Sequence, residues 1–139
     1  MDRYIIDTNI LVQIITEQNF KEEVHYMLNY SGAQIYVSSA SVQELINLLQ
    51  CEDVKLQKQK NVSVLNVFDF IENTLGYTIK YIDKGHLKQL CQIGIIDKHT
   101  DPFDRIIIAQ AITEHIPLIS SDKKFPKYKK MGLDFIPNY

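Results

Sequence analysis

The sequence has 139 residues, of which 45% are hydrophobic and 23% are charged, and its formal net charge is −2. These values are ordinary for a soluble globular protein and exclude a chain that is disordered throughout. The length matches one domain, so we expect residues 1–139 to fold as a single unit. The two cysteines, Cys51 and Cys91, form no CxxC motif, which excludes a zinc ribbon and a disulfide scaffold.

The N-terminal residues MDRYIID contain acidic side chains and no long apolar run. We therefore expect neither a secretory signal peptide nor a membrane span, and no membrane partner. Together with the few cysteines, this predicts a protein of the reducing cytoplasm.

Charge is unevenly distributed along the chain. The first fifty residues hold six acidic and two basic side chains, whereas five lysines fall between Lys123 and Lys130. The slightly acidic total argues against a protein that coats duplex DNA nonspecifically. It leaves room for an enzyme that binds a nucleic acid locally, with the lysine segment either contacting phosphates or forming an ordinary solvated surface.

Short apolar runs alternate with stretches of helical periodicity. In chain order, strands are predicted at residues 4–6, 35–37, 78–82, 116–119 and 134–136. Helical spacing of apolar residues predicts helices around residues 10–15, 20–28, 42–49, 64–75, 87–91 and 101–111. Residues 50–61 are polar and are predicted to be a solvated helix end or a connection.

Turn and cap residues support these boundaries. Gly32 breaks the second helix, and Gly76 ends the fourth. Asp101 is a good N-cap and Pro102 suits the first helical position, so a helix begins there. Strands that alternate with helices predict an α/β fold with a parallel sheet covered on both faces. In such a sheet, ligands bind beyond the carboxyl ends of the strands, near the point where the strand order reverses.

Four carboxylates fall at strand ends or early helix positions. Asp7 directly follows the first strand, and Asp122 follows the fourth. Glu44 lies one turn into the helix after the second strand, and Asp104 lies in the first turn of the helix that begins at Asp101. Like charges repel at close range, so such a cluster requires protons or a cation. Hard divalent ions such as Mg²⁺ prefer oxygen ligands and can activate water against a phosphoryl group.

Three of these acids also have a purely structural explanation. Asp7 could cap the next helix, although Thr8 or Asn9 could serve as the cap and leave Asp7 free. Glu44 lies opposite the apolar stripe of its helix and could simply be solvated. Asp122 could be an ordinary turn residue after a strand.

The segment around Asp104 is harder to explain structurally. Asp104 lies on a helix that is apolar nearly all round, which predicts a central helix whose carboxylate needs a partner. Asp101, by contrast, is better explained as a cap than as a ligand. His99 could act as a base or be structural, and Arg105 could contact a phosphate or balance the acids.

Other side chains have ordinary explanations. Tyr128, among the lysines, could stack on a base but fits packing better. Cys51 and Cys91 are expected in the core or on a helix face, because no basic cluster marks a reactive thiol. The remaining histidines share no metal-ligand spacing and predict no zinc site.

Four segments, taken together, resemble a known family. Residues 6–9 read IDTN, residues 38–45 read SSASVQEL, and residues 119–125 read ISSDKKF. The most specific segment is HTDPFDR at residues 99–105, followed by IAQA at residues 108–111. In this order, the motifs resemble the PIN domain, and most closely the VapC-type toxin ribonucleases of type II toxin–antitoxin pairs. The resemblance covers nearly the whole chain.

The resemblance implies a PIN-like α/β/α sandwich with a central, mainly parallel sheet of about five strands. It implies that Asp7, Glu44, Asp104 and Asp122 form an acidic catalytic site that binds Mg²⁺, which Mn²⁺ could replace. Asp7 and Asp104 would be the principal ligands. The side chains expected to support the ligands from behind are Thr8, Asn9, Asp101 and Ser121. The expected RNA contacts are Arg105, Lys123 and Lys124.

The functional hypothesis is a magnesium-dependent endoribonuclease, the toxin of a toxin–antitoxin pair, that hydrolyses RNA phosphodiesters with a metal-activated water. Its partners would be the RNA substrate, a cognate antitoxin and a second copy in a homodimer. The alternative is a PIN-like module that binds RNA or protein without cleavage, although a pure binder has no need to concentrate carboxylates against a polyanion. An aspartyl-phosphate phosphatase with Asp7 as nucleophile fits less well, because those enzymes commonly carry a second acid where this chain has Asn9.

The helices around residues 10–30 and 45–75 contain more apolar residues than one stripe requires. Surplus apolar surface near the site would suit an antitoxin segment that folds into a groove. The residues that suggest this surplus are Ile10, Leu11, Val12, Leu48 and Leu49.

Overall fold

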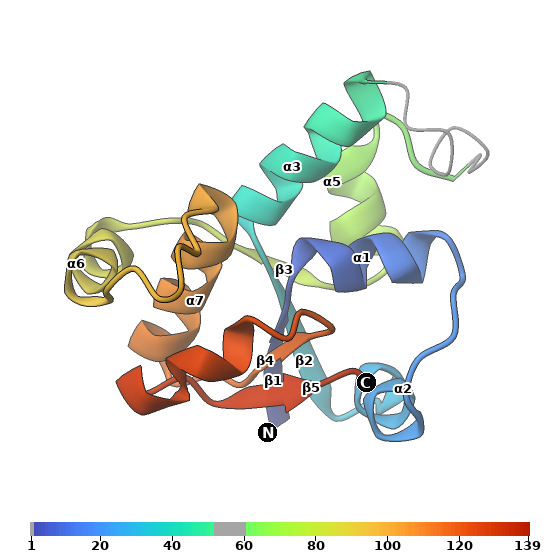
Figure 1. The fold of residues 1–139 in the computed structure, drawn as a ribbon. Helices are drawn as coiled ribbons and strands as arrows, with labels where there is room; N and C mark the ends of the chain where they lie inside the picture. The colour runs from blue at the N-terminus through green and yellow to red at the C-terminus, as the bar shows by residue number, and fades with distance from the viewer. Residues whose placement is uncertain (1, 52–60) are drawn as a thin grey trace.

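The computed structural model describes residues 2–51 and 61–139. In these residues, five strands form one sheet in the order β3-β2-β1-β4-β5, and every neighbouring pair is parallel (Figure 1). This confirms the predicted α/β fold with a parallel central sheet. The strands are β1 (Asp2–Ile6), β2 (Ala33–Ser38), β3 (Thr78–Lys80), β4 (Leu118–Ser120) and β5 (Phe135–Pro137).

Helices connect the strands because parallel neighbours require crossovers. The connection from β2 to β3 includes a π-helical turn, η1, and the connection from β4 to β5 is a 3₁₀ helix, η2. The helices are α1 (Thr8–Ile15), α2 (Glu22–Asn29), α3 (Ser39–Gln50), α5 (Val67–Asp69), η1 (Phe70–Thr74), α6 (Lys84–Gln92), α7 (Pro102–Glu114) and η2 (Phe125–Met131). None of those in the described ranges is both long and apolar enough to cross a membrane.

Each face of the sheet packs against its own apolar cluster. Consecutive strand residues point to opposite faces, so Ile6 joins the cluster under α1, α2 and α5, while Ile5 joins the cluster under α7 and η2. Figure 1 shows α1, α3 and α5 gathered on one side of the strands and α6 and α7 on the other. The result is a three-layer α/β/α arrangement.

The segment between α3 and β3 differs from its predicted form. The helix expected over residues 64–75 begins only at Val67 and continues as the π-helical turn η1. Leu65 is 99% exposed and does not take part in the apolar stripe. The end of this helix is as predicted, since Gly76 adopts a positive φ of 73°. Most of the polar stretch at 50–61 lies outside the described residues.

The predicted surplus of apolar surface is wrong for the first helix. Ile10 and Leu11 are fully buried in the chain's own core, because α1 is covered by both the sheet and α3. Leu48 and Leu49 are partly buried against the same core. Of the two places expected for the cysteines, the core is wrong and the helix face is right for Cys91, which is free and exposed on α6, while Cys51 is free and exposed at the C-terminal cap of α3.

Candidate active site

The fold brings the predicted acids to the carboxyl edge of the sheet. Asp7 follows the end of β1, and Asp122 follows the end of β4. Because β1 and β4 are parallel neighbours, their carboxyl ends lie side by side. Helix α7 returns from this edge to the start of β4, so its N-terminal turn, with Asp104, lies at the same edge. The strand order reverses between β1 and β4, which is where α/β sheets bind ligands.

Asp7 is a buried carboxylate with two hydrogen-bond donors. Its side chain is the N-cap of α1, where Oδ1 accepts from the Ile10 amide at 2.9 Å. Its Oδ2 accepts from the Ser120 hydroxyl at 2.5 Å. The alternative in which Thr8 or Asn9 caps the helix is therefore wrong. Asp7 can still accept further bonds while it caps the helix, because a carboxylate has about four lone-pair sites.

Burial dominates the electrostatics of Asp7. Loss of solvent raises the pKa of Asp7 to about 7, although the bonds from Ser120 and Ile10 oppose the rise. The charges of Asp104 and Asp122 raise the pKa further. These effects show that the three acids lie close enough to repel one another, and that a cation at this edge would stabilise the ionised form.

Glu44 is half-buried on the first turns of α3 and points toward α1. Its Oε1 accepts a hydrogen bond of 2.6 Å from Thr8, whose hydroxyl also lies 3.1 Å from Ser41 Oγ. Burial raises the pKa of Glu44, and the charges of Asp101 and Asp104 add to the rise. The solvated-face explanation of Glu44 is thus wrong, because α3 packs against both α1 and α7.

Asp104 lies one turn from the start of α7 and is a quarter exposed. Its Oδ2 is 3.1 Å from His99 Nε2. Burial raises the pKa of Asp104, the His99 contact opposes this, and the charges of Asp101 and Asp122 reinforce it. Asp101 itself is exposed and caps α7, accepting from the amides of Phe103 at 2.9 Å and of Asp104 at 3.1 Å. The predicted cap is confirmed.

Asp122 lies in the turn after β4. Its backbone amide donates to Ser120 Oγ at 2.9 Å, and its Oδ1 accepts from the Lys124 amide at 2.8 Å. The Ser120 hydroxyl therefore links the Asp122 backbone to the Asp7 carboxylate. Ser121 points elsewhere, with its hydroxyl 3.3 Å from Gln13 and 2.9 Å from Asn138.

In the part of the chain that the structure describes, the acids at this edge have no Lys or Arg partner. Among residues 2–51 and 61–139, neither Lys nor Arg forms an ion pair with Asp7, Glu44, Asp104 or Asp122, and only His99 contacts one of them. Oxygen donors without internal counter-charge fit a hard divalent cation. In the described part of the chain, no three of these acids bring oxygens within 4.8 Å of one another, so any cation held here would be contacted directly by at most two of them in this arrangement and by water otherwise.

The residues that were expected to support the acids or to contact RNA lie in different environments. Asn9 is exposed on the first turn of α1, and the two donors to Asp7 are other groups. Arg105 points inward, where Nη2 donates to the Ile93 carbonyl at 3.1 Å. Lys123 lies over the Tyr139 ring, 5.4 Å from its centroid, and Lys124 is exposed.

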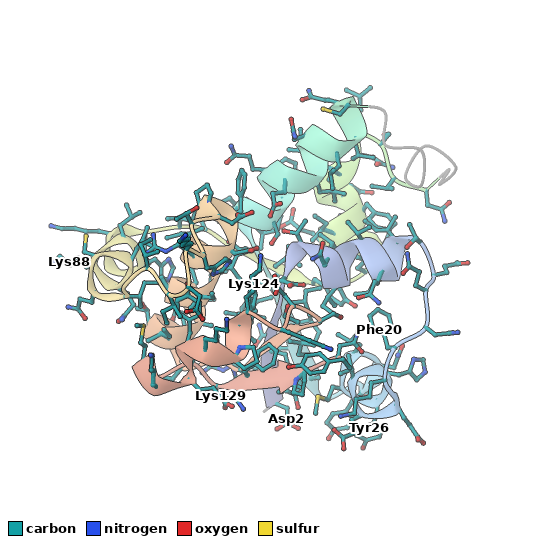
Figure 2. All side chains as sticks on the ribbon, viewed as in Figure 1. Asp2, Phe20, Tyr26, Lys88, Lys124 and Lys129 are labelled. Carbon is teal, nitrogen blue, oxygen red and sulfur yellow. The ribbon has the colours of Figure 1, made fainter. Side chains whose placement is uncertain are left out.

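The lysine segment begins before η2, with Lys123 and Lys124, and continues on its surface with Lys127, Lys129 and Lys130. Figure 2 labels Lys124 and Lys129 on this part of the chain. Lys127 differs from its neighbours, because its Nζ is 2.6 Å from Asp97 Oδ2 in an exposed ion pair. Tyr128, by contrast, is fully buried, so packing and not base stacking explains it.

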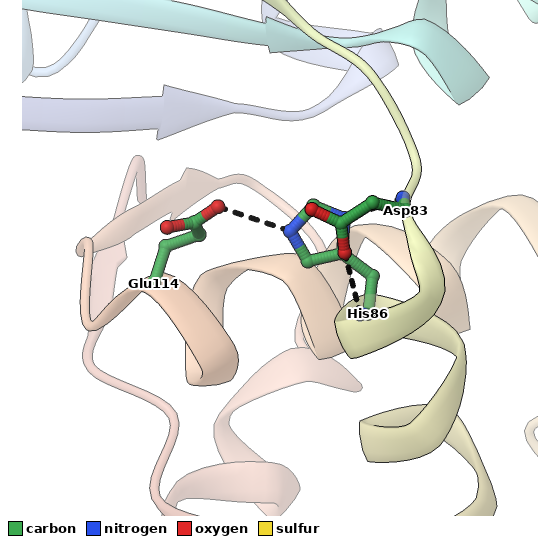
Figure 3. A group of neighbouring side chains, drawn as sticks. All are labelled: Asp83, His86 and Glu114. Atoms are coloured by element: carbon green, nitrogen blue, oxygen red, sulfur yellow. Dashed lines mark hydrogen bonds and ion pairs between the residues drawn. The ribbon is translucent and has the colours of Figure 1, made fainter.

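Sequence reasoning missed one group of close ligand atoms. Asp83, His86 and Glu114 bring a carboxylate, an imidazole and a second carboxylate within 4.8 Å, close enough by distance to share a cation (Figure 3). However, the Asp83 amide donates to His86 Nδ1 at 3.1 Å. The neutral ring then carries its proton on Nε2, which is 3.1 Å from Glu114 Oε1. A metal ion would have to replace that proton.

A positive charge already occupies this second site. Lys80 Nζ is 3.3 Å from the same Glu114 oxygen, and these contacts lower the pKa of Glu114. Asp83 and His86 form a reciprocal capping box at the start of α6. The group therefore joins α6 to α7, and the acids at the sheet edge remain the better cation site.

Two further residues of the edge have contacts that the sequence did not predict. Ser120 is the last residue of β4, and its hydroxyl contacts Asp7 across 113 positions. His99 is buried by Phe125 and Tyr128, which come from η2. Both residues lie in motifs of the sequence, but only the spatial neighbourhood shows which groups their side chains contact.

Comparison with solved structures shows the same fold. VapBC2 from Rickettsia felis, bound to a DNA fragment from its promoter, aligns with a TM-score of 0.69 and 19% identity over 97% of this chain and 98% of that chain. DNA-bound VapBC from Salmonella typhimurium aligns with a TM-score of 0.67 and 16% identity over the full length of both chains. FitAcB from Neisseria gonorrhoeae aligns with a TM-score of 0.63 and 18% identity over 97% of each chain.

Comparison with curated proteins gives no match. Comparison with protein families gives a match to the PIN domain over residues 4–131, which include all four acids of the sheet edge. The chain therefore belongs to the PIN domain family.

Proposed function

We propose that this chain is a metal-dependent endoribonuclease whose cation is held by Asp7, Glu44, Asp104 and Asp122. The observation that carries the proposal is the placement of these four carboxylates, from four separate segments, at one edge of the sheet without a Lys or Arg partner among the described residues. Membership of the PIN domain family supports it. Mg²⁺ is the proposed ion, with Mn²⁺ as a substitute, because the donors are all oxygens.

When bound, such an ion activates water for attack on a phosphodiester and stabilises charge on the phosphoryl group. The chain's own residues prepare for this step. Ser120 and the Ile10 amide donate to Asp7 and oppose the rise in its pKa that burial causes. Thr8 orients Glu44. The exposed lysines of η2 would receive the RNA backbone, which the acids alone would repel.

The alternative of a module that binds RNA without cleavage explains less. Burial raises the pKa of Asp7 to about 7, and each neighbouring acid adds repulsion. A protein that only grips a polyanion gains nothing from this arrangement, whereas a nuclease uses the acids to hold its cation.

We further propose that the protein is the toxin of a toxin–antitoxin pair and forms a homodimer. The similar solved structures include a toxin–antitoxin complex from Klebsiella pneumoniae (TM-score 0.62, 16% identity). A surface hollow of about 690 Å³ beside α1 and α2 offers apolar and acidic side chains to a partner segment, among them Ile14, Phe20 and Glu22. Figure 2 labels Phe20 and Tyr26 on this side of the molecule.

The partner proposal has a direct test. Co-expression with the product of the adjacent small open reading frame should give a stable complex that does not cleave RNA. Light scattering of the purified protein should give twice the chain mass. If no adjacent gene product binds or neutralises the protein, the toxin–antitoxin assignment fails and the nuclease assignment stands.

The nuclease proposal is tested by Asp104→Asn, with Asp134→Asn as the matched control. Both changes remove one carboxylate charge, but Asp134 is exposed and lies away from the acids of the sheet edge. Cleavage of a labelled single-stranded RNA in Mg²⁺ should fall by at least about 100-fold for Asp104→Asn and stay unchanged for Asp134→Asn. EDTA should abolish wild-type cleavage. An Asp104→Asn protein that cuts at the wild-type rate would overturn the proposal.

A further inference from the structure

His99 occupies an unusual position for a loop histidine. Its side chain is about 5% exposed, although no strand or helix contains it. The ring packs against Phe125, at a centroid distance of 6.1 Å, and meets the edge of Tyr128 at 5.6 Å. Both nitrogens have polar partners: Nδ1 is 2.8 Å from the Tyr128 hydroxyl, and Nε2 is 3.1 Å from Asp104 Oδ2.

The direction of these hydrogen bonds follows from the partners. An ionised carboxylate only accepts, so His99 Nε2 carries a hydrogen and donates it to Asp104. In the neutral ring, Nδ1 is then the acceptor, and the Tyr128 hydroxyl donates to it. In the charged ring, Nε2 still donates to Asp104. The contact to Asp104 is therefore the same in both forms of the ring.

Tyr128 holds the imidazole from the far side. It is fully buried on η2, and the guanidinium of Arg105 lowers the pKa of its phenol against a larger rise from burial. A chain of contacts thus leads from the 3₁₀ helix, through Tyr128 and His99, to one oxygen of Asp104.

The other oxygen of Asp104 has no hydrogen-bond partner among residues 2–51 and 61–139. Asp104 also lies close enough to Asp7, Glu44 and Asp122 for mutual repulsion. Repulsion alone would turn this side chain, which is a quarter exposed, toward solvent. A donor fixed behind Oδ2 opposes that rotation and leaves the second oxygen for a ligand. Ligating carboxylates are commonly held by such hydrogen bonds.

We propose that His99 is a positioning residue that holds Asp104 in the orientation needed to bind the divalent cation, with Tyr128 fixing the imidazole. This inference rests on the proposed function, because it takes Asp104 as a metal ligand. In this proposal, His99 does not act as a base, and its role is more than packing in the core.

Two variants separate positioning from packing. In His99→Gln, the side-chain amide reaches the place of Nε2 and can still donate to Asp104. In His99→Asn, the shorter amide reaches only the place of Nδ1, so it keeps the contact with Tyr128 and loses Asp104. Both replacement side chains are polar, and they differ in size by only one methylene group. Tyr128→Phe tests the chain of contacts without changing His99.

The measurements are Mn²⁺ affinity by titration calorimetry and the melting temperature in EDTA. We expect His99→Asn to lose 10- to 100-fold in Mn²⁺ affinity, His99→Gln to stay near the wild-type value, and Tyr128→Phe to show a smaller loss than His99→Asn. If His99 were only structural, the two His99 variants would melt lower and bind Mn²⁺ as the wild type does.

The outcomes also separate this inference from the proposed function. A wild-type protein that binds Mn²⁺, together with folded His99→Asn and Tyr128→Phe proteins of unchanged affinity, would overturn the inference alone. A wild-type protein that binds no Mn²⁺ and cleaves no RNA would overturn both. Should His99→Asn fail to fold, an unchanged affinity of Tyr128→Phe would be sufficient to reject the proposed chain of contacts.

Discussion

The Ser120 hydroxyl donates a 2.5 Å hydrogen bond to Asp7 Oδ2 and accepts one of 2.9 Å from the Asp122 amide. One small side chain at the end of β4 therefore connects two acids that are 115 positions apart in the sequence. It lies at the junction of β1 and β4, where the strand order reverses. The geometry of the candidate site depends on this junction as much as on the acids themselves.

Removal of this hydroxyl should weaken the site. In Ser120→Ala, Asp7 loses a donor that lowers its pKa, so its pKa should rise above about 7. Mn²⁺ must then compete with a more tightly bound proton, and we expect affinity at neutral pH to fall 10- to 100-fold. Calorimetric titration at pH 7 and pH 8.5 checks this. The loss should be smaller at the higher pH, and an equal loss at both would contradict the proton-competition explanation.

The stability of the metal-free protein should fall as the pH rises from about 4 to 7. Burial raises the pKa of Asp7 from 3.8 to about 7, so the folded state binds a proton that the unfolded state has released in this interval. A rise of about three pH units corresponds to roughly 4 kcal/mol of unfolding free energy, lost by pH 8. Urea unfolding in EDTA at pH 4.5 and pH 8 measures this.

Asp7→Asn isolates that contribution, because asparagine cannot ionise and its carbonyl can still accept from the Ile10 amide. We expect the variant to be more stable than the wild type at pH 8 in EDTA, with the difference shrinking toward pH 4.5. A variant that is less stable at pH 8 would show that the Asp7 charge stabilises the fold, against the predicted sign.

Asp101 should affect stability through the start of α7. Its carboxylate caps the helix by accepting from two backbone amides, so Asp101→Ala should cost about 0.5–2 kcal/mol of unfolding free energy. Asp101→Ser keeps the cap and should restore most of that loss. RNA cleavage by Asp101→Ser should match the wild type. A large loss of cleavage in this variant would make Asp101 part of the site chemistry.

The lysines of η2 should differ in their effect on RNA binding. Replacement of the exposed Lys124, Lys129 and Lys130 by Gln should reduce the salt dependence of single-stranded RNA binding by about 0.7 in slope per lost phosphate contact. Lys127→Gln is the internal control, because Lys127 is already paired with Asp97. Fluorescence anisotropy over a range of salt concentrations gives the slopes. If the salt dependence of RNA binding has the same slope in all variants, the lysine segment is an ordinary solvated surface that contacts no phosphates.

The sequence was sufficient for features that local patterns determine. The alternation of strands and helices predicted the parallel sheet, and the pair Asp101–Pro102 predicted the start of α7. The rule that ligands bind at the carboxyl ends of strands predicted where to look for Asp7. These inferences need only propensity, periodicity and topology, which act over a few neighbouring residues.

Features that depend on tertiary contacts could not be predicted from the sequence. Glu44 is opposite the apolar stripe of α3, yet it is half-buried because α1 and α7 both cover that helix. His99 opens the HTDPFDR segment, but its burial could not be predicted, since residues from η2 bury it. Ile10 and Leu11 gave an apparent surplus of apolar surface, which the core of the chain itself absorbs. In each case, a neighbour distant in sequence decides the environment.

The position of β1 has a consequence for protein synthesis. β1 lies near the start of the chain but in the middle of the sheet, and β4, its neighbour at the candidate site, begins only at Leu118. Because a chain emerges from the ribosome with its N-terminal part first, Asp7 is synthesised well before Ser120 and Asp122. A chain that ends before β4 would contain Asp7 and Glu44 but would lack Ser120 and Asp122 beside them. Strand order thus leaves the sheet edge that carries the acids incomplete until Leu118–Ser120 and Asp122 have been synthesised.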